Sequence, residues 1–526
     1  MNPSRMSVLL VLCATALALA LRLPSLELRP MHTDEAVHAV KFGDLLEKGE
    51  YRYDPYEFHG PTLNYLSLPI AWVRGQKTIT QVDETTLRLL PVLFGVGLVL
   101  LWLLIAGGIG RCATVVAALL TALSPAFVFY SRYYIMEILL VFFTGLLIGS
   151  LYRYSQKRKW YWLTVAGTAL GLMIATKETW IIAVAALAGA SAIVGLWRGF
   201  TQGPHVRPPS QKRAPSLLQP AQLPLALGVS LFVAFLFLSS FCQHPEGFID
   251  AFRTYAIYFD RAEGSDYHLH AWSFYFKRLF YYHPAPGPVW SEALIAALAL
   301  VGLIVSLAGR RRNAAHPWFL RLLAVYTLLI TLVYTALPYK TPWCLLGFWH
   351  GMIGLAGIGG AALFQILRPW PIKIVLAAAL LLGGVHLAKQ AHSANVRFHD
   401  DQRNPYVYAH TTRSAVRLAQ RVEELSHFHP AGHNLRINLI AHPDNYWPLP
   451  WYLRNFSHGS NTVGFFTEIP AEPDVPVVIT SRALAPAVRD KLSQEYVSDV
   501  YGLRPDVLLF LYVQQDLWNA FMESRH

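Results

Sequence analysis

Carboxylates and histidines gather just after the first apolar run of the chain. The stretch Met31–His38 carries Asp34 and Glu35 side by side, with His38 one helical turn beyond Asp34. A carboxylate in this place could act as a general base that takes a proton from a hydroxyl or an amine. We predict a helix over 34–47, and the structural alternative is that Thr33 or Asp34 only caps this helix. We take Asp34 and Glu35 as candidate catalytic residues and His38 as a candidate substrate contact.

A second acidic position lies at the start of a later apolar run. The segment Tyr130–Glu137 places Arg132 shortly before Glu137. Ionisable residues in membrane-spanning segments are costly and commonly mark functional sites. Glu137 is therefore the third candidate catalytic carboxylate, and Arg132 is a candidate ligand for a phosphate. The structural alternative is an ion pair between Arg132 and Glu137 that holds the end of the helix.

Two lysines in other predicted loops could also neutralise a phosphate. Lys177 lies beside Glu178 in a short connection, and Tyr339 and Lys340 lie in a stiff loop bounded by prolines. We predict that Lys177, Lys340 and Tyr339 contact a phosphate group. Lys177 could instead form an ion pair with Glu178. Lys340 could instead only extend along the apolar surface, so that its charge reaches the headgroup region.

Three further residues are candidate substrate contacts. His59 lies in the first long loop, and Tyr282 and His283 precede a proline-rich approach to an apolar run. A lone histidine such as His59 is also common at membrane interfaces. His283, with His268 and His270, could ligate a divalent metal ion, but the sequence does not fix their spacing. A metal therefore stays an open alternative, and the sequence requires no cofactor.

The elements that must position these residues are apolar helices. Of 526 residues, 54% are hydrophobic and 14% are charged, whereas a soluble domain carries about a quarter charged residues. The apolar residues concentrate in runs of roughly 17–22 residues, which is the length that crosses a bilayer as a helix. We predict eleven spans, which lie near 7–23, 87–106, 113–130, 135–152, 160–176, 179–197, 224–242, 289–308, 320–337, 343–363 and 372–388.

The basic residues predict the orientation. With the N-terminus inside, the inner segments contain sixteen Lys and Arg residues and no Asp or Glu, which is a strong positive-inside signal. The net charge of +12 therefore reflects topology. It does not indicate a nucleic-acid partner, which would need a basic patch on a folded face. We expect a multi-pass protein of the cytoplasmic (inner) membrane with long outer loops at 24–86 and 243–288, and a disordered inner loop at 198–224.

The apolar runs stop after residue 388. We predict a membrane domain over 1–388 and an extracytoplasmic α/β domain over 389–526, with helices at 413–427 and 485–494. Expected strands lie at 435–441, 476–481 and 506–513, and this alternation favours a parallel sheet. The aromatic stretch 446–453 could bind the face of a sugar ring, or could only pack against the membrane domain.

Several of these motifs together resemble the GT-C superfamily of membrane glycosyltransferases. The closest branch is that of the protein mannosyltransferases and aminoarabinose transferases, on the motifs Asp34–Glu35, Tyr130–Arg132 with Glu137, and Thr176–Lys177. The stretches 339–343 and 446–453 are more similar to a subgroup described as flippase-activity-associated membrane proteins. The resemblance covers the whole chain in arrangement.

The resemblance implies a helical membrane bundle with two helices in the first outer loop. It implies a polyprenyl-phosphate-linked sugar as donor, membrane lipids around it, and a glycan, lipid or protein as acceptor. Asp34 would be the base with Glu137 in support, and the mechanism would be inverting. Many relatives carry a lysine where Gly60 precedes Pro61 here, so that phosphate contact would pass to Lys340, Lys177 or Arg132.

A non-catalytic reading is the rival. The chain could be a flippase, or an accessory protein of one, whose carboxylates bind lipid-linked sugars without chemistry. A carrier should need polar residues through the middle of its spans, whereas the charged candidates here cluster at the outer ends. The sequence also lacks a glycine-rich nucleotide-binding loop, which argues against a soluble nucleotide-sugar donor. These two features favour a membrane glycosyltransferase.

Overall fold

A computed structural model describes residues 3–56, 59–201, 222–262, 268–308, 316–456 and 462–524. Most of the inner loop predicted to be disordered falls on 202–221, outside the described residues. The chain divides into two compact units, each of which is assembled from separate segments. The first unit comprises Met1–Leu26, Glu50–Ile70 and Arg88–Tyr406, and the second comprises Glu27–Gly49, Ala71–Leu87 and Val407–His526.

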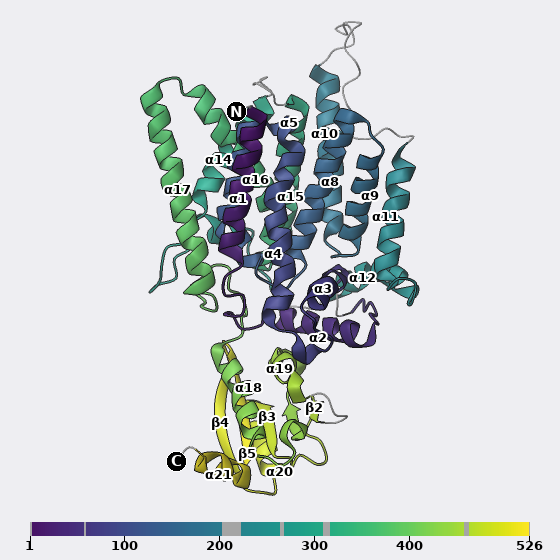
Figure 1. Ribbon diagram of the computed structural model, residues 1–526, viewed down its shortest axis with the longest axis vertical. Helices are drawn as coiled ribbons and strands as arrows, with labels where there is room; N and C mark the ends of the chain where they lie inside the picture. The colour runs from purple at the N-terminus through teal and green to yellow at the C-terminus, as the bar shows by residue number, and fades with distance from the viewer. Residues whose placement is uncertain are drawn as a thin grey trace. The chain divides into compact units, whose positions relative to one another are not determined.

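The first unit is a bundle of apolar helices (Figure 1). Seven segments of the described chain are long and apolar enough to cross a membrane. They are α1 (Pro3–Arg22), α4 (Glu84–Leu101) continued by η2 (Trp102–Ile105) and α5 (Ala106–Ile109), α8 (Glu137–Lys157), α10 (Trp180–Thr201), α15 (Pro317–Ala336), η4 (Pro342–Leu345) continued by α16 (Leu346–Ile366), and α17 (Trp370–Val396).

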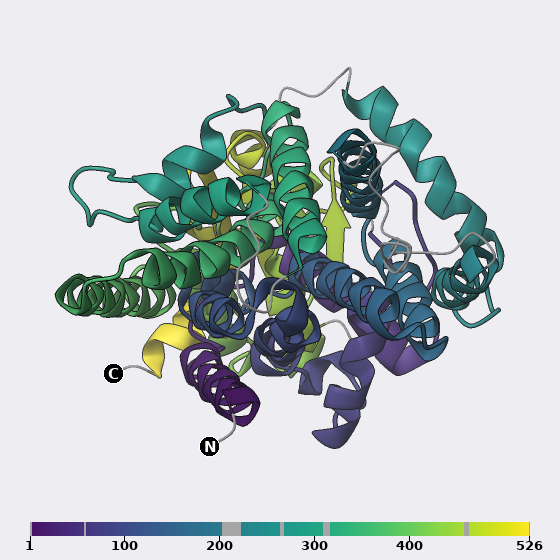
Figure 2. The same ribbon diagram turned by 90° about the horizontal axis from the view of Figure 1, so that it is seen from above.

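Four shorter apolar helices complete the bundle, namely α6 (Arg111–Leu123), α9 (Tyr161–Ile174), α11 (Leu223–Leu238) and α14 (Ala293–Ala308). Together the long and short helices match the predicted apolar runs, so the helical membrane architecture is confirmed. The number that crosses the bilayer and their orientation stay predictions. Seen from above, many of these helices run nearly along the line of view (Figure 2).

Small residues allow the closest helix contacts. In the pair α14 and α16, a Cβ on Gly302 would lie 1.8 Å from the Leu355 carbonyl oxygen, and one on Gly359 would lie 2.0 Å from that of Leu298. Only glycine fits at either position. Close backbone approach of this kind is the usual way helices pack in a membrane, where lipid removes the hydrophobic driving force between them.

The predicted span at 113–130 is interrupted, which corrects the expectation of one continuous helix. The helix α6 ends at Leu123, and a second helix, α7 (Pro125–Tyr130), begins directly afterwards. Pro125 has no N–H to continue the helix, and the Ser124 hydroxyl accepts a hydrogen bond from the Phe127 N–H as an N-cap. The chain therefore bends shortly before Arg132 and Glu137.

The loop predicted at 24–86 contains two helices, as the resemblance implied. They are α2 (Thr33–Lys48) and α3 (Thr62–Val73), followed by the short η1 (Ile79–Gln81). The predicted helix after Thr33 is confirmed, and Gly49 ends it in the left-handed conformation with φ of 70°. The second long loop, predicted at 243–288, contains α12 (Glu246–Ala262) and α13 (Phe274–Phe280).

The C-terminal residues form a five-stranded mixed sheet in the order β2-β1-β3-β5-β4. The strands are β1 (Ile437–Ile440), β2 (Val463–Phe466), β3 (Val477–Ser481), β4 (Tyr496–Arg504) and β5 (Val507–Gln514). Strands β2, β1 and β3 are parallel, whereas β5 pairs antiparallel with both β3 and β4. The expectation of an all-parallel sheet is therefore wrong, because the short turn between β4 and β5 can join only antiparallel neighbours.

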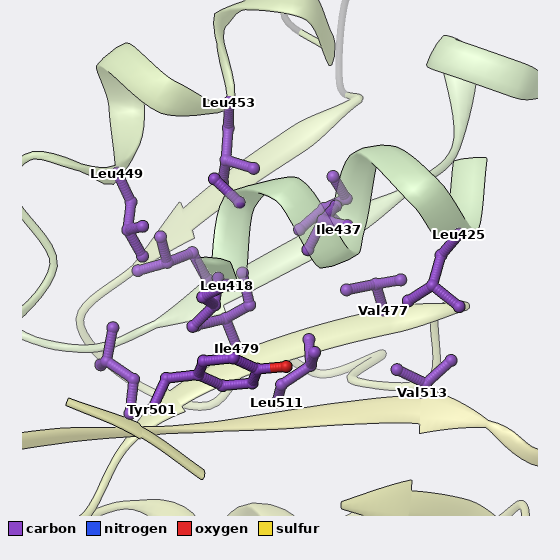
Figure 3. Packing of buried hydrophobic residues seen from close by; sticks show 14 of the residues in the cluster. Leu418, Leu425, Ile437, Leu449, Leu453, Val477, Ile479, Tyr501, Leu511 and Val513 are labelled. Carbon is purple, nitrogen blue, oxygen red and sulfur yellow. The ribbon is translucent and has the colours of Figure 1, made fainter. Parts of the chain in front are cut away.

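Helices cover this sheet and close its hydrophobic core. The helix α18 (Arg413–Ser426) directs Leu418 and Leu425 at Ile437, Ile479 and other strand residues, as Figure 3 shows. The remaining helices are α19 (Leu449–Tyr452), α20 (Ala485–Lys491) and α21 (Gln515–Glu523). Full burial of each large aliphatic side chain contributes about 1.5–3 kcal/mol, so this core makes the C-terminal part a stable platform.

The predicted orientation can be tested with two exposed positions. In a background without native cysteines, we expect Gln494→Cys to react with a membrane-impermeant maleimide in intact cells. We expect Lys159→Cys, which follows α8, to react only after the cells are lysed, because its neighbours are basic. The reverse labelling pattern would contradict the positive-inside assignment and the outer location of the candidate site.

Candidate functional site

The two adjacent carboxylates at the start of α2 have different surroundings. Glu35 is fully buried and its Oε2 accepts a hydrogen bond from the His32 N–H at 3.1 Å. His32 is the N-cap, and its Nδ1 accepts from the Asp34 N–H at 3.0 Å, which completes a reciprocal cap. Arg29 lies 3.8 Å from the other oxygen of Glu35. The Asp34 side chain, in contrast, is 42% exposed and is open to a substrate.

The hydrogen bonds of His32 define its protonation state. Because Nδ1 accepts from the Asp34 N–H, the proton of the neutral ring is on Nε2, which donates to the Tyr408 carbonyl oxygen at 3.1 Å. Burial lowers the pKa of His32, although the Asp34 and Glu35 carboxylates and the Tyr408 carbonyl oppose this effect. The nearby Arg504 charge lowers it further. A neutral His32 is therefore part of the cap that presents Asp34.

In the first unit, Glu137 and Lys177 form a buried ion pair. Their residues are 6% and 8% exposed, and the Lys177 Nζ donates directly to the Glu137 Oε1. The neighbouring Glu178 instead accepts from the His59 Nδ1 at 2.7 Å. The sequence offered two ion pairs as structural alternatives, Arg132 with Glu137 and Lys177 with Glu178. The structure instead pairs Glu137 with Lys177 and Glu178 with His59.

The loops that carry His59 and Lys177 lie against each other. A Cβ on Gly60 would lie 2.1 Å from the Ala175 carbonyl oxygen, so a larger residue cannot occupy this position without movement of the backbone. The Thr62 N–H donates to the same carbonyl at 3.3 Å, and the hydroxyls of Thr62 and Thr176 share a hydrogen bond of 2.8 Å. The close approach explains why glycine stands at position 60.

This loop contact also determines the charge of Glu178. Burial alone would raise the pKa of Glu178, but the His59 imidazole, by its charge and its hydrogen bond, and the nearby Lys177 hold that pKa below its ordinary value. Glu178 is therefore ionised at neutral pH and accepts the hydrogen bond from His59. Lys177 donates to Glu137.

The ion pair lies in the wall of a cavity within the first unit. The centre of a water-sized molecule can reach about 50 Å³ of this cavity. Apart from the ion pair its lining is mainly apolar, with contributions from α4, α8, α15 and α16 that include Leu101, Leu140, Ile148, Leu323, Ile330 and Leu346. Ile148 follows Glu137 by three turns of α8, which is about 16 Å along the helix. The cavity therefore joins a charged end to a long apolar interior.

One further polar group of this wall is His350. Its Nε2 atom is buried and has no hydrogen-bond partner in the described part of the chain. The ring lies 4.7 Å from that of Trp102, measured between centroids, and both residues line the cavity.

Arg132 and Lys340 donate hydrogen bonds to backbone carbonyls. The Arg132 guanidinium donates to the carbonyl oxygens that follow α1, at 3.0 Å to Arg22, 2.6 Å to Pro24 and 2.8 Å to Ser25. The Lys340 Nζ donates to the His270 carbonyl at 3.0 Å and to the Leu337 carbonyl, and burial lowers the pKa of Lys340. Both cations therefore hold connections between elements.

The remaining predicted residues do not join the ion pair. Tyr339 is 56% exposed and stacks edge-on with His268. Tyr282 pairs with Trp290 through the backbone, and His283 is exposed. None of these lines the cavity that contains Glu137 and Lys177.

His38 is buried in α2, within the second unit. Asp34 and Glu35 belong to that unit too, whereas Glu137 belongs to the first, so their shared role stays a prediction. Among the described residues, no three histidine, cysteine or acidic side chains gather in a way that could hold a metal ion.

The sequence reasoning missed a fully buried carboxylate, Glu292, directly before α14. It accepts hydrogen bonds from Tyr406 OH at 2.6 Å, Ser124 Oγ at 2.5 Å, Ala126 N–H at 3.0 Å and Trp349 Nε1 at 3.1 Å. These partners come from the start of α7, from α16 and from the segment after α17, so Glu292 joins them into one structure. The signal was present, because a lone acidic residue before an apolar run is unusual.

Comparison with solved structures identifies the fold. The chain is similar to ArnT from Cupriavidus metallidurans bound to undecaprenyl phosphate, with a TM-score of 0.60 and 13% identity over 95% of this chain and 97% of that one. It is also similar to the oligosaccharyltransferase AglB from Archaeoglobus fulgidus in complex with an inhibitory peptide and a dolichol-phosphate. There the TM-score is 0.54 and the identity is 11%, over 99% of this chain and 77% of that one.

The chain has the fold of the GT-C membrane glycosyltransferases. The sequence family described as dolichyl-phosphate-mannose-protein mannosyltransferase matches residues 57–208, which include the Glu137–Lys177 pair of this GT-C fold. Comparison with curated proteins gives no match. The GT-C fold makes the chain a multi-pass membrane protein, in agreement with its apolar helices.

The cap formed by His32 predicts a response to pH. When folding lowers the pKa of a histidine, the folded protein loses stability as the pH falls below the pKa of that histidine in the unfolded chain, which is about 6.5. Protonated Nδ1 also cannot accept from the Asp34 N–H. We therefore expect the hydrogen-exchange protection of the first turn of α2 to fall from about pH 7 to about pH 5, after correction for intrinsic exchange.

The matched variant is His32→Asn, because asparagine caps helices well but does not titrate in this range. Its protection should depend on pH much less than that of the wild type. An equal pH dependence in the two proteins would show that His32 does not control the cap.

Proposed function

We propose that the chain is a glycosyltransferase that moves a sugar from a polyprenyl-phosphate-linked donor to an acceptor on the outer face of the cytoplasmic membrane. The observation that carries the proposal is the cavity with the Glu137–Lys177 pair at one end and apolar walls beyond it. A prenyl phosphate has the same distribution of charge and apolar surface. The polyprenyl phosphates in the structures of ArnT and AglB support this choice of donor.

We assign the donor phosphate first to Lys177. An ammonium group has three donors, so Lys177 can keep Glu137 and still contact a phosphate oxygen. Its contact would stabilise the negative charge that grows on the leaving phosphate. Arg132 and Lys340 already donate to carbonyls, so we give them a smaller part in phosphate binding, with Tyr339 beside Lys340.

We assign the acceptor's proton to Asp34. In the transfer, an acceptor oxygen or nitrogen forms a bond to the anomeric carbon, and the bond from that carbon to the phosphate oxygen breaks. The phosphate leaves with the electron pair, and the Asp34 carboxylate takes the acceptor's proton. Direct displacement of this kind inverts the anomeric centre. Glu35 is proposed to act through the cap that presents Asp34, and His38, His59, Tyr282 and His283 to act as outer substrate contacts.

The base assignment predicts a large and selective loss of activity. Asp34→Asn keeps the shape of the side chain and removes the proton acceptor, so transfer should fall by about 10²–10⁴-fold while donor binding persists. The transfer rate of Glu35→Gln should fall less than that of Asp34→Asn, because glutamine can still complete the cap. The rates are measured with purified protein and a panel of polyprenyl-phosphate sugars. Full activity in a well-folded Asp34→Asn protein would remove Asp34 as the base.

The donor assignment predicts a block by a side chain placed in the cavity. A Cβ on Gly347 meets only ordinary contacts, with 3.4 Å to the Tyr334 ring, so a larger residue there fits the helix and fills the cavity. We expect Gly347→Leu to raise the donor KM at least about tenfold, equivalent to about 1.4 kcal/mol of binding. The control is Gly195→Leu in α10, where nothing lies within 4 Å of the added Cβ. An unchanged donor KM in Gly347→Leu would contradict lipid binding in this cavity.

A further inference from the structure

The C-terminal domain holds the stretch that begins α2. The Met31 N–H donates to the Tyr452 OH at 2.7 Å, and His32 Nε2 donates to the Tyr408 carbonyl at 3.1 Å. The hydroxyl of Thr33 donates to the Trp447 carbonyl at 3.5 Å. All of these residues belong to the second unit. The turn that presents Asp34 therefore depends on residues far away in sequence, beyond position 400.

Arg504 adds a charged contact to the same turn. Its Nη1 donates to the Thr33 Oγ1 at 3.2 Å. Arg504 is the last residue of β4, where the register with β5 shifts between Gly502 and Arg504. An irregularity of this kind changes the direction of a side chain at the end of a strand. The antiparallel pairing of β4 with β5 fixes the backbone that carries the Arg504 side chain.

The guanidinium also interacts with two carboxylates of this region. Burial lowers the pKa of Arg504, and the charges of Asp444 and Asp34 oppose that effect. Among the described residues, Thr33 is its only hydrogen-bond acceptor. An arginine has five N–H donors in a planar group. The guanidinium therefore holds Thr33 while it lies within electrostatic reach of Asp34.

We propose that Arg504 is a positioning residue for Asp34, through which the C-terminal domain becomes part of the transfer site. It fixes the first turn of α2 through the Thr33 hydroxyl, and Thr33 directly precedes the proposed base. The proposal rests on the proposed function for its effect on the reaction. The C-terminal domain then has a defined part in catalysis, because removal of one of its side chains should misplace the base without loss of the domain.

The test compares single and double variants in the transfer assay. Arg504→Gln and Thr33→Val each remove the contact, and each should lower kcat about tenfold, equivalent to about 1.4 kcal/mol, with the donor KM unchanged. If the two residues act through one contact, the double variant should lose little more than either single variant. Thr33→Ser restores the hydroxyl and should recover most of the activity that Thr33→Val loses.

The control is Arg436→Gln, an exposed arginine just before β1. It should keep the wild-type kcat, since Arg436 has no part in the turn. A wild-type kcat in Arg504→Gln would overturn the proposal. Losses that multiply in the double variant would overturn it as well, because they would show that Arg504 and Thr33 act separately.

A second measurement separates this proposal from the proposed function. Hydrogen exchange of the amides of residues 33–36 reports the order of the turn whether or not transfer is detected. Arg504→Gln should exchange these amides faster than Arg436→Gln, and unchanged protection would contradict the positioning role. A wild type that transfers no sugar would overturn the proposed function, while the exchange result would still decide the contact between Arg504 and Thr33.

Discussion

The first unit depends on the pairing of buried charges where its helices begin. An uncompensated charge in a low-dielectric interior costs several kcal/mol, so Glu137 and Lys177 stabilise the structure only as a pair. The other nearby carboxylate, Glu178, instead accepts a hydrogen bond from His59 beside the close contact at Gly60. The same arrangement leaves a cation in the wall of an apolar cavity, which is the property that binding of a lipid phosphate requires.

The second unit places a different requirement on the chain. A proton acceptor must be accessible, yet it must be held in a defined position. The first turn of α2 meets both conditions, because buried Glu35 and neutral His32 form the cap while Asp34 remains exposed. Contacts from Tyr452, Tyr408 and Arg504 then join this turn to the C-terminal sheet.

Much of the architecture could be predicted from local patterns. The apolar runs, α2 and three of the strands follow from composition and periodicity, which need only neighbouring residues. The strands β2 and β4 were not predicted, and the antiparallel pairing of β5 could not be read from the spacing of elements. Pairing depends on which edges meet after the chain has folded.

The candidate site was predicted in its residue types more than in its contacts. Glu137 and Lys177 were both selected, but adjacency in sequence suggested other partners for them. Lys340 and Arg132 were predicted as phosphate ligands. Their hydrogen bonds to backbone carbonyls could not be predicted, because those carbonyls lie in distant or irregular segments. The steric reason for Gly60, the buried Glu292 and the contact from Arg504 depend on side chains that only the folded chain brings together.

We propose that this chain breaks the bond between a sugar and a polyprenyl phosphate. The most direct measurement uses purified protein in liposomes that contain a doubly labelled donor, with one label on the lipid and one on the sugar. The account predicts that free polyprenyl phosphate and sugar-bearing acceptor appear together in a one-to-one ratio. Movement of the intact donor between leaflets, with both labels still on one molecule and no polyprenyl phosphate released, would contradict it.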